Sequence, residues 1–221
     1  MTTDEAVAGT TTPPPAGLRE RKKQRTRAAL VRSALELFTR QGYERTTVDE
    51  IAEAVEVSQR TFFRYFANKE EVAFASQESA ECHFFAALCA RPAGEAPLAA
   101  LRGATLDAWG SIGGALEQLV PPELHMRMYR VIESTPSLLA VHLRRIAELE
   151  ERLAREIARR EGLDIDADPR PRLVVAMFGG VIRVAGKLWT EGDEDSVVTL
   201  RDLTAFHLDY VGPTLAEKWD K

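Results

Sequence analysis

Apolar residues recur along this chain at intervals of three and four, and this spacing constrains the fold more than any other feature. The clearest run lies between residues 137 and 161, where the spacing follows the pitch of an α-helix: Leu139, Leu143, Ile146, Leu149, Leu153 and Ile157. No segment alternates apolar and polar residues as a half-buried β-strand does. The pattern predicts an all-α protein with about nine helices.

Composition sets apart an N-terminal arm, and we place the boundary between two helical units within the fourth expected helix. Residues 1–17 are rich in Thr, Pro, Ala and Gly and predict a disordered arm. Residues 18–70 are expected to form a small N-terminal domain, and residues 71–221 a larger one. Gly42, a capping box from Thr47 to Glu50, and N-caps at Ser58 and Asn68 separate the first four helices. The expected helices are 18–41, 47 to before 58, 59–66, 68–88, 97–119, 122–134, 137–161, 169–190 and 196–218.

Composition excludes several classes of protein. Hydrophobic residues make up 45% of the chain, which is enough for a substantial core. The most apolar stretch, residues 173–189, is interrupted by Arg183 and Lys187, and the N-terminus lacks the basic and apolar regions of a signal peptide. Two cysteines cannot build a disulfide framework. We therefore expect a cytoplasmic protein with no membrane partner.

The charge of the chain is unevenly distributed. Its net charge is −5, yet residues 18–45 hold nine basic and three acidic side chains, whereas residues 71–221 hold 17 basic and 24 acidic ones. A basic front on an acidic body suits a phosphate-rich partner. A solvated charged helix would give the same composition, so charge alone leaves both interpretations open.

Residues 46–69 (TTVDEIAEAVEVSQRTFFRYFANK) predict a helix-turn-helix, because only about three residues separate two short helices. With Phe62 and Phe66 buried, the rest of the second helix points outward. Gln and Arg can read base edges in a major groove, and Ser and Thr can bind phosphates. The alternative is a helical hairpin in which Phe62, Phe63, Tyr65 and Phe66 are all core.

These residues resemble the DNA-binding domain of the tetracycline-repressor (TetR) family. The resemblance covers roughly residues 25–72: Leu30 to Phe38, Gly42-Tyr43, Thr46-Thr47-Val48, Ile51-Ala52, Val57-Ser58, Thr61 to Phe66 and Lys69-Glu70. It implies a homodimer with about nine helices per subunit, whose last two helices form a four-helix bundle with those of the partner. It also implies a double-stranded DNA operator and an unidentified small-molecule inducer whose binding causes release.

The resemblance and the outward face together give the candidate DNA contacts. Gln59 and Arg60 stand where such proteins contact bases, and Thr47, Thr61, Tyr65 and Lys69 stand at phosphate-contacting positions. The full set is Arg25, Arg27, Thr47, Ser58, Gln59, Arg60, Thr61, Phe63, Arg64, Tyr65 and Lys69.

Two positions depart from the family pattern. Phe63 replaces a tyrosine, so one hydroxyl–phosphate bond is missing, although the ring could contact a thymine methyl group. Glu56 replaces the turn glycine and costs on the order of 1 kcal/mol if it must adopt a positive φ.

The larger unit offers candidates for a pocket and for a dimer surface. A small, mainly apolar ligand is expected among the helices of residues 80–190. Its candidate contacts are Phe84, Phe85, Trp109, His125, Met126, Tyr129, Phe178 and Trp189. The candidate dimer residues are Val174, Phe178, Val181, Ile182, Leu203, Phe206 and Tyr210. Most of these residues would also serve a plain helical core.

No catalytic apparatus, metal site or cofactor motif is visible in the sequence. The four histidines are scattered, and Asp164, Asp166 and Asp168 are followed by Pro169 where a calcium loop needs glycine. The expectation is a sequence-specific repressor that is not an enzyme. A DNA-binding activator or architectural factor without a ligand stays open, and a small all-α enzyme is a more remote alternative.

Overall fold

The computed structural model describes residues 17–117, 119–192 and 197–216, and within these ranges the chain is helical with no strand. The helices are α1 (Leu18–Gln41), α2 (Val48–Glu53), α3 (Gln59–Phe63), α4 (Lys69–Ala90), α5 (Pro97–Glu117), α6 (Pro122–Ser134), α7 (Pro136–Glu161), α8 (Arg170–Glu191) and α9 (Val197–Ala216). The predicted all-α fold is confirmed. The predicted arm, residues 1–17, lies almost wholly outside the described residues.

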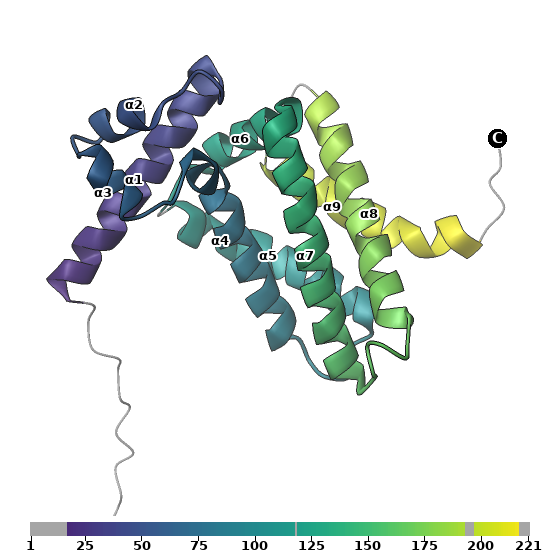
Figure 1. The fold of residues 1–221 in the computed structure, drawn as a ribbon. Coiled ribbons are helices and arrows are strands. Elements are labelled where there is room, and N and C mark those ends of the chain that lie inside the picture. The colour runs from purple at the N-terminus through teal and green to yellow at the C-terminus, as the bar shows by residue number, and fades with distance from the viewer. Residues whose placement is uncertain (1–16, 118, 193–196, 217–221) are drawn as a thin grey trace, which may run out of the picture.

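The helices form a small head and a larger body (Figure 1). Helices α1, α2 and α3 make the head, and α4 leads from it into the body, where it packs against α5, α6 and α7. Helices α7, α8 and α9 pack in sequence across the body. The C-terminal part of α9 runs away from the body (Figure 1).

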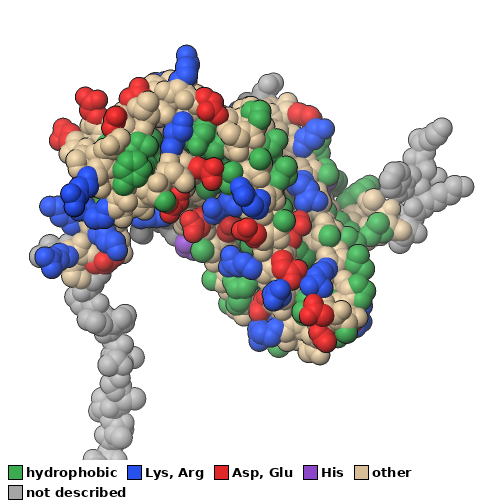
Figure 2. All heavy atoms as spheres, in the orientation of Figure 1, with side chains coloured by type: hydrophobic (Ala, Val, Ile, Leu, Met, Phe, Trp, Pro, Cys, Tyr) green, Lys and Arg blue, Asp and Glu red, His purple; other side chains and the backbone are tan. Residues whose placement is uncertain are grey.

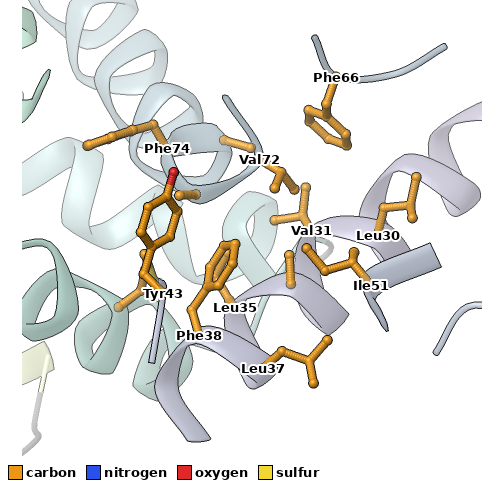
Figure 3. Packing of buried hydrophobic residues seen from close by; sticks show 14 of the residues in the cluster. Leu30, Val31, Leu35, Leu37, Phe38, Tyr43, Ile51, Phe66, Val72 and Phe74 are labelled. Carbon is orange, nitrogen blue, oxygen red and sulfur yellow. The ribbon is translucent and has the colours of Figure 1, made fainter. Parts of the chain in front are cut away.

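The core of the head is built on one face of α1. Leu30, Val31, Leu35 and Phe38 are fully buried, as their three- and four-residue spacing predicts (Figure 3). The residues that join them from α2, α3 and the turn after α3 are Ile51, Ala52, Phe62 and Phe66. Burying Phe62 on α1 fixes which face of α3 is left to solvent.

The same core continues into the body. Val72 and Phe74 of α4, together with Leu124 and Met128 of α6, belong to the cluster that contains the α1 residues. Helix α6 also packs directly on α1. The head is therefore attached to the body by shared apolar packing as well as by the chain.

Side-chain caps fix where α2 and α3 begin. Thr47 accepts from the backbone N–H of Glu50, and Glu50 accepts from that of Thr47, which completes the predicted capping box. Ser58 Oγ accepts from the Thr61 N–H at 3.2 Å, as its predicted N-cap role requires. The sequence places the end of α3 at Phe66, but the structure ends it at Phe63, because the chain tightens into a turn in which the Tyr65 N–H donates to the Phe62 carbonyl at 2.8 Å.

The corner between α2 and α3 requires a left-handed residue. The Val57 N–H donates to the Ala52 carbonyl at 3.0 Å, and Glu56 takes φ 55°, the one positive φ at a residue other than glycine in the described chain. A side chain is strained in this conformation. Glu56 therefore adopts the positive φ that was expected for the residue in place of the turn glycine.

We predict that Glu56→Gly raises the free energy of unfolding by about 1 kcal/mol, because glycine removes the left-handed strain. Glu56→Gln removes the charge but keeps the side chain, so it should leave stability unchanged. Urea unfolding followed by circular dichroism measures both variants. Equal effects of the two substitutions would contradict the backbone explanation.

Candidate DNA interface and ligand cavity

Helix α3 exposes the polar side chains that the sequence assigns to base contacts. Gln59, Arg60 and Arg64 are exposed, whereas Phe62 is fully buried on the opposite side. Phe63 is 48% exposed, so the alternative in which all four aromatic residues form the core is wrong. The side of α3 that faces solvent makes no part of the core and carries the residue types that read a major groove.

Basic side chains gather where α1 begins, close to α3. Figure 2 shows Lys and Arg concentrated at that end of the head, with Asp and Glu towards α2. Arg25 is exposed there. Arg27 is half-buried, with its guanidinium carbon 5.2 Å from the centre of the Phe66 ring, so the core of the head fixes its position.

Two of the candidate phosphate contacts, Thr47 and Lys69, already donate hydrogen bonds to other groups of the head. The Thr47 N–H and hydroxyl both donate to Glu50 Oε2, at 2.8 and 3.1 Å. Lys69 Nζ donates to the carbonyls of Tyr43 and Thr46, at 2.9 and 3.1 Å. Lys69 thereby ties the first turn of α4 to the loop before α2, and both residues would have to share these donors with a phosphate.

The remaining candidates lie at the two ends of α3. The hydroxyls of Ser58 and Thr61 are 3.0 Å apart and hydrogen-bonded to each other. The Arg64 guanidinium lies over the ring of Tyr65, which is half-buried against the head core. These groups flank Gln59 and Arg60 on one surface.

A largely apolar cavity of about 270 Å³ lies in the body between α4, α5, α6, α7, α8 and α9. It is lined by six of the eight predicted ligand residues: Phe84, Trp109, His125, Met126, Tyr129 and Phe178. The rings of Phe84 and Phe178 are stacked with centres 5.7 Å apart. These side chains come from four helices and meet in one wall.

Phe85 and Trp189 lie outside the cavity wall. Phe85 follows Phe84 on α4 and so points about 100° away around the helix, where the Arg152 guanidinium lies 4.7 Å from its ring centre. Trp189 is 2% exposed and packs under Arg130, 4.9 Å from the guanidinium carbon. Both are core residues, the ordinary role that the sequence left open.

Sequence reasoning found His125 but missed its polar neighbours in and beside the cavity wall. Ser76 Oγ bonds His125 Nδ1 at 3.1 Å, and Gln77 Nε2 bonds His142 Nδ1 at 3.0 Å. Burial lowers the pKa of His125 to about 4, so its ring is neutral near pH 7. Three side chains of acidic or basic residues also line the wall: Glu81, Glu150 and Arg183. Gln77 and Glu81 could have been found from the sequence, because their helical spacing places them on the same face of α4 as Phe84.

Comparison with known proteins establishes the family. The family model for bacterial regulatory proteins of the tetR family matches residues 30–75, and the model for the MftR C-terminal domain matches residues 95–216. The HTH-type transcriptional regulator TcmR of Streptomyces glaucescens is 50% identical over 94% of this chain and 92% of its own length. The chain belongs to the TetR family.

Solved structures show the same fold. The fatty acid degradation regulator FadR of Bacillus halodurans covers 87% of this chain and 97% of its own, with a TM-score of 0.57 and 16% identity. A transcriptional regulator from Aquifex aeolicus covers 87% and 99%, with a TM-score of 0.54 and 15% identity. The protein is thus a TetR-family helix-turn-helix transcriptional regulator. Such regulators bind DNA operators and act as dimers.

Helix α8 of this TetR-family regulator has two apolar faces. The expected dimer residues Val174, Val181 and Ile182 are half-buried against the body core, and Phe178 is buried in the cavity wall. A second face, which the sequence analysis did not select, exposes Leu173, Met177, Val184 and Leu188. Periodicity identifies both faces, but it cannot tell which one the monomer buries.

The exposed face of α8 continues onto α9. Phe206 and Tyr210 are 59% and 58% exposed and stack with ring centres 5.4 Å apart, while Leu203 is half-buried. An apolar groove of about 300 Å³ lies between the two helices, lined by Met177, Val184, Tyr210 and Leu215 among others. We give the name outer face to seven exposed apolar residues of α8 and α9: Leu173, Met177, Val184, Leu188, Phe206, Tyr210 and Leu215.

Helix α8 is also the one described helix that is long and apolar enough to cross a membrane. A single marginal helix does not indicate a membrane protein, and regulators of this family are in general soluble and cytoplasmic. Within the described chain no three His, Cys, Asp or Glu side chains come together to hold a metal ion.

We predict that His125 makes this regulator sensitive to acid. Its pKa falls from 6.5 to about 4 on folding, so the unfolded chain binds more protons between these values and stability is lost as the pH falls through this window. The free energy of unfolding of the wild type should fall relative to that of His125→Gln by about 3 kcal/mol across it. Denaturation at a series of pH values measures the difference, and parallel curves would contradict the assignment.

Proposed function

We propose that this TetR-family regulator is a homodimeric repressor that leaves a near-palindromic operator when a small, mainly apolar ligand enters the cavity. The observation that carries the proposal is the outer surface of α3, where Gln59 and Arg60 stand beside a basic edge of the head. Regulators of this family are typically ligand-responsive repressors, which supports the same conclusion.

In this proposal α3 lies in the major groove. Arg60 reads a guanine edge and Gln59 an adenine edge, since these side chains make bidentate bonds with those bases. Phe63 contacts a thymine methyl group. Phosphates are held by the surrounding hydroxyl and cationic groups: Arg25, Arg27, Thr47, Ser58, Thr61, Arg64, Tyr65 and Lys69.

The dimer forms in this proposal through the outer face of α8 and α9. Exposed apolar side chains along two adjacent helices form a patch that monomeric proteins seldom leave uncovered. A two-fold pairing places two α3 helices on one side of the DNA, so the operator has matching half-sites. Residues 18–70 then act as the DNA-binding domain and residues 71–221 as the ligand and dimer domain of a cytoplasmic protein.

Ligand binding is proposed to act on the head through α4 and α6. Gln77 and Phe84 of α4 and His125 and Met126 of α6 line the cavity, and the same two helices share the core of α1. A ligand that binds best when α4 and α6 are displaced would favour a different spacing of the two heads. The operator then loses one of its two half-site contacts.

The cavity favours this proposal over the alternatives. A ligand-independent activator or architectural factor has no use for a void of about 270 Å³ lined by aromatic side chains. We also propose that the ligand is bound and not turned over, so that the protein is not an enzyme.

We predict that Arg60 provides sequence preference and Arg25 provides general affinity. Arg60→Lys keeps the charge but loses the bidentate geometry, so it should weaken operator binding about tenfold or more and leave random DNA unaffected. Arg25→Ala should weaken both DNAs alike and reduce the salt slope by about 2 per dimer. Fluorescence anisotropy with the upstream DNA of its own gene tests both. If the folded dimer binds that DNA no better than random DNA, the repressor proposal fails.

We predict that Val184→Glu yields monomers, because it places an unpaired charge in the middle of the outer face. Leu143→Glu is the matched control, since Leu143 is 52% exposed on α7 and lies outside that face. Light scattering after size exclusion measures the mass of each variant, and the Val184→Glu monomer should also lose specific operator binding. A dimeric Val184→Glu would show that the interface lies elsewhere.

A further inference from the structure

One of the four acidic or basic side chains in the cavity wall carries a charge that nothing in the wall compensates. Arg183 Nη1 donates to Glu150 Oε1 at 3.0 Å, so these two charges cancel. His125 is neutral near pH 7, because burial lowers its pKa to about 4. The remaining group is Glu81 of α4, which leaves the wall with one negative charge.

The side chain of Glu81 is half-buried and makes no hydrogen bond or ion pair in the described chain. Burial raises the pKa of its carboxyl, and Arg145 and Arg152 of α7 lower it while Glu78 and Glu148 raise it. Burial is the largest of these effects, and no side chain in the described chain donates a hydrogen bond to the carboxylate to compensate for the water it has lost.

The two cationic neighbours are held by aromatic rings. The Arg145 guanidinium carbon lies 5.3 Å from the centre of the Phe74 ring, and that of Arg152 lies 4.7 Å from the centre of the Phe85 ring. Both stay out of ion-pair reach of Glu81. The carboxylate remains available to a molecule in the cavity.

A second acceptor lies one helical turn before Glu81. Gln77 Nε2 bonds His142 Nδ1 at 3.0 Å, and the Gln77 carbonyl oxygen is then buried with no partner. Residues four apart on a helix lie on the same face, so the two acceptors are neighbours. Both residues line the cavity, whose remaining wall is mostly apolar and includes the stacked rings of Phe84 and Phe178.

On the basis of the proposed ligand response, we infer that the ligand is an apolar, ring-containing molecule that presents a hydrogen-bond donor, and no negative charge, to Glu81 and Gln77. A carboxylate accepts hydrogen bonds only, and charge-assisted bonds are the stronger kind in a site with little water. An anionic ligand would bring like charges together in an apolar wall. A protonated amine or a hydroxyl group supplies the donor.

Four naphthalene compounds with one attachment position test this inference: naphthylmethylamine, naphthylmethanol, its methyl ether and naphthoic acid. Calorimetric titration of the full-length dimer should give the amine and the alcohol about tenfold tighter binding than the ether, and the acid the weakest. An amine that binds more tightly than the alcohol identifies ammonium as the preferred donor, and the reverse order identifies hydroxyl.

Glu81→Gln removes the charge and keeps an acceptor oxygen, so it should weaken the amine and strengthen the acid, each about tenfold, with the alcohol little changed. A general loss of structure would weaken the binding of all four compounds, so it cannot weaken the amine and strengthen the acid. Glu161→Gln, at the exposed C-terminal end of α7 and outside the cavity wall, is the matched control and should change none of the four affinities.

Either of two results with the wild type overturns the inference and leaves the ligand-responsive regulator standing: equal binding of ether and alcohol, or an acid that binds as tightly as the amine. Unchanged affinities in Glu81→Gln do the same. If none of the four compounds binds, the inference is overturned, and the result also counts against ligand response. Operator binding tests separately whether the protein is a DNA-binding regulator.

Discussion

The packing of two phenylalanines on α1 is the constraint on which the rest of the structure depends. Phe62 and Phe66 are buried against Leu30, Val31 and their neighbours, with ring centres 5.7 Å apart. Because α3 has only five residues, burying Phe62 determines the direction of every other side chain on it. Gln59 and Arg60 point outward as a consequence of that packing, and a groove-reading surface results.

The same packing connects DNA binding to events in the body. The cluster that supports α3 extends through Val72 and Phe74 of α4 to α6, and both of these helices line the cavity. No flexible linker separates the two parts, so a shift of α4 or α6 reaches α1 through direct contact. The Ser137 hydroxyl, which donates to Glu44 at 2.8 Å, is a further link between the start of α7 and the head.

Local signals in the sequence predicted the head well and the body only in part. The capping box at Thr47, the cap at Ser58 and the strained Glu56 depend on neighbours within a few residues, so they could be read directly. The end of α3 was placed three residues too late, because the chain tightens after Phe63 into a turn in which the Tyr65 N–H donates to the Phe62 carbonyl. The cavity wall was partly found, since aromatic residues mark it, but its polar residues and the outer face of α8 depend on which of two helix faces meets a neighbour. The spacing of apolar residues does not show which of the two faces is buried.

The central claim, that α3 reads DNA from the major groove, is tested most directly by operators with altered groove edges. Replacing half-site purines with 7-deazapurines removes an acceptor in the major groove, and replacing guanine with inosine removes a donor in the minor groove. Binding of the wild-type dimer to each operator should weaken markedly with the first change and stay nearly constant with the second. An operator that tolerates 7-deazapurines throughout but fails with inosine would contradict the account.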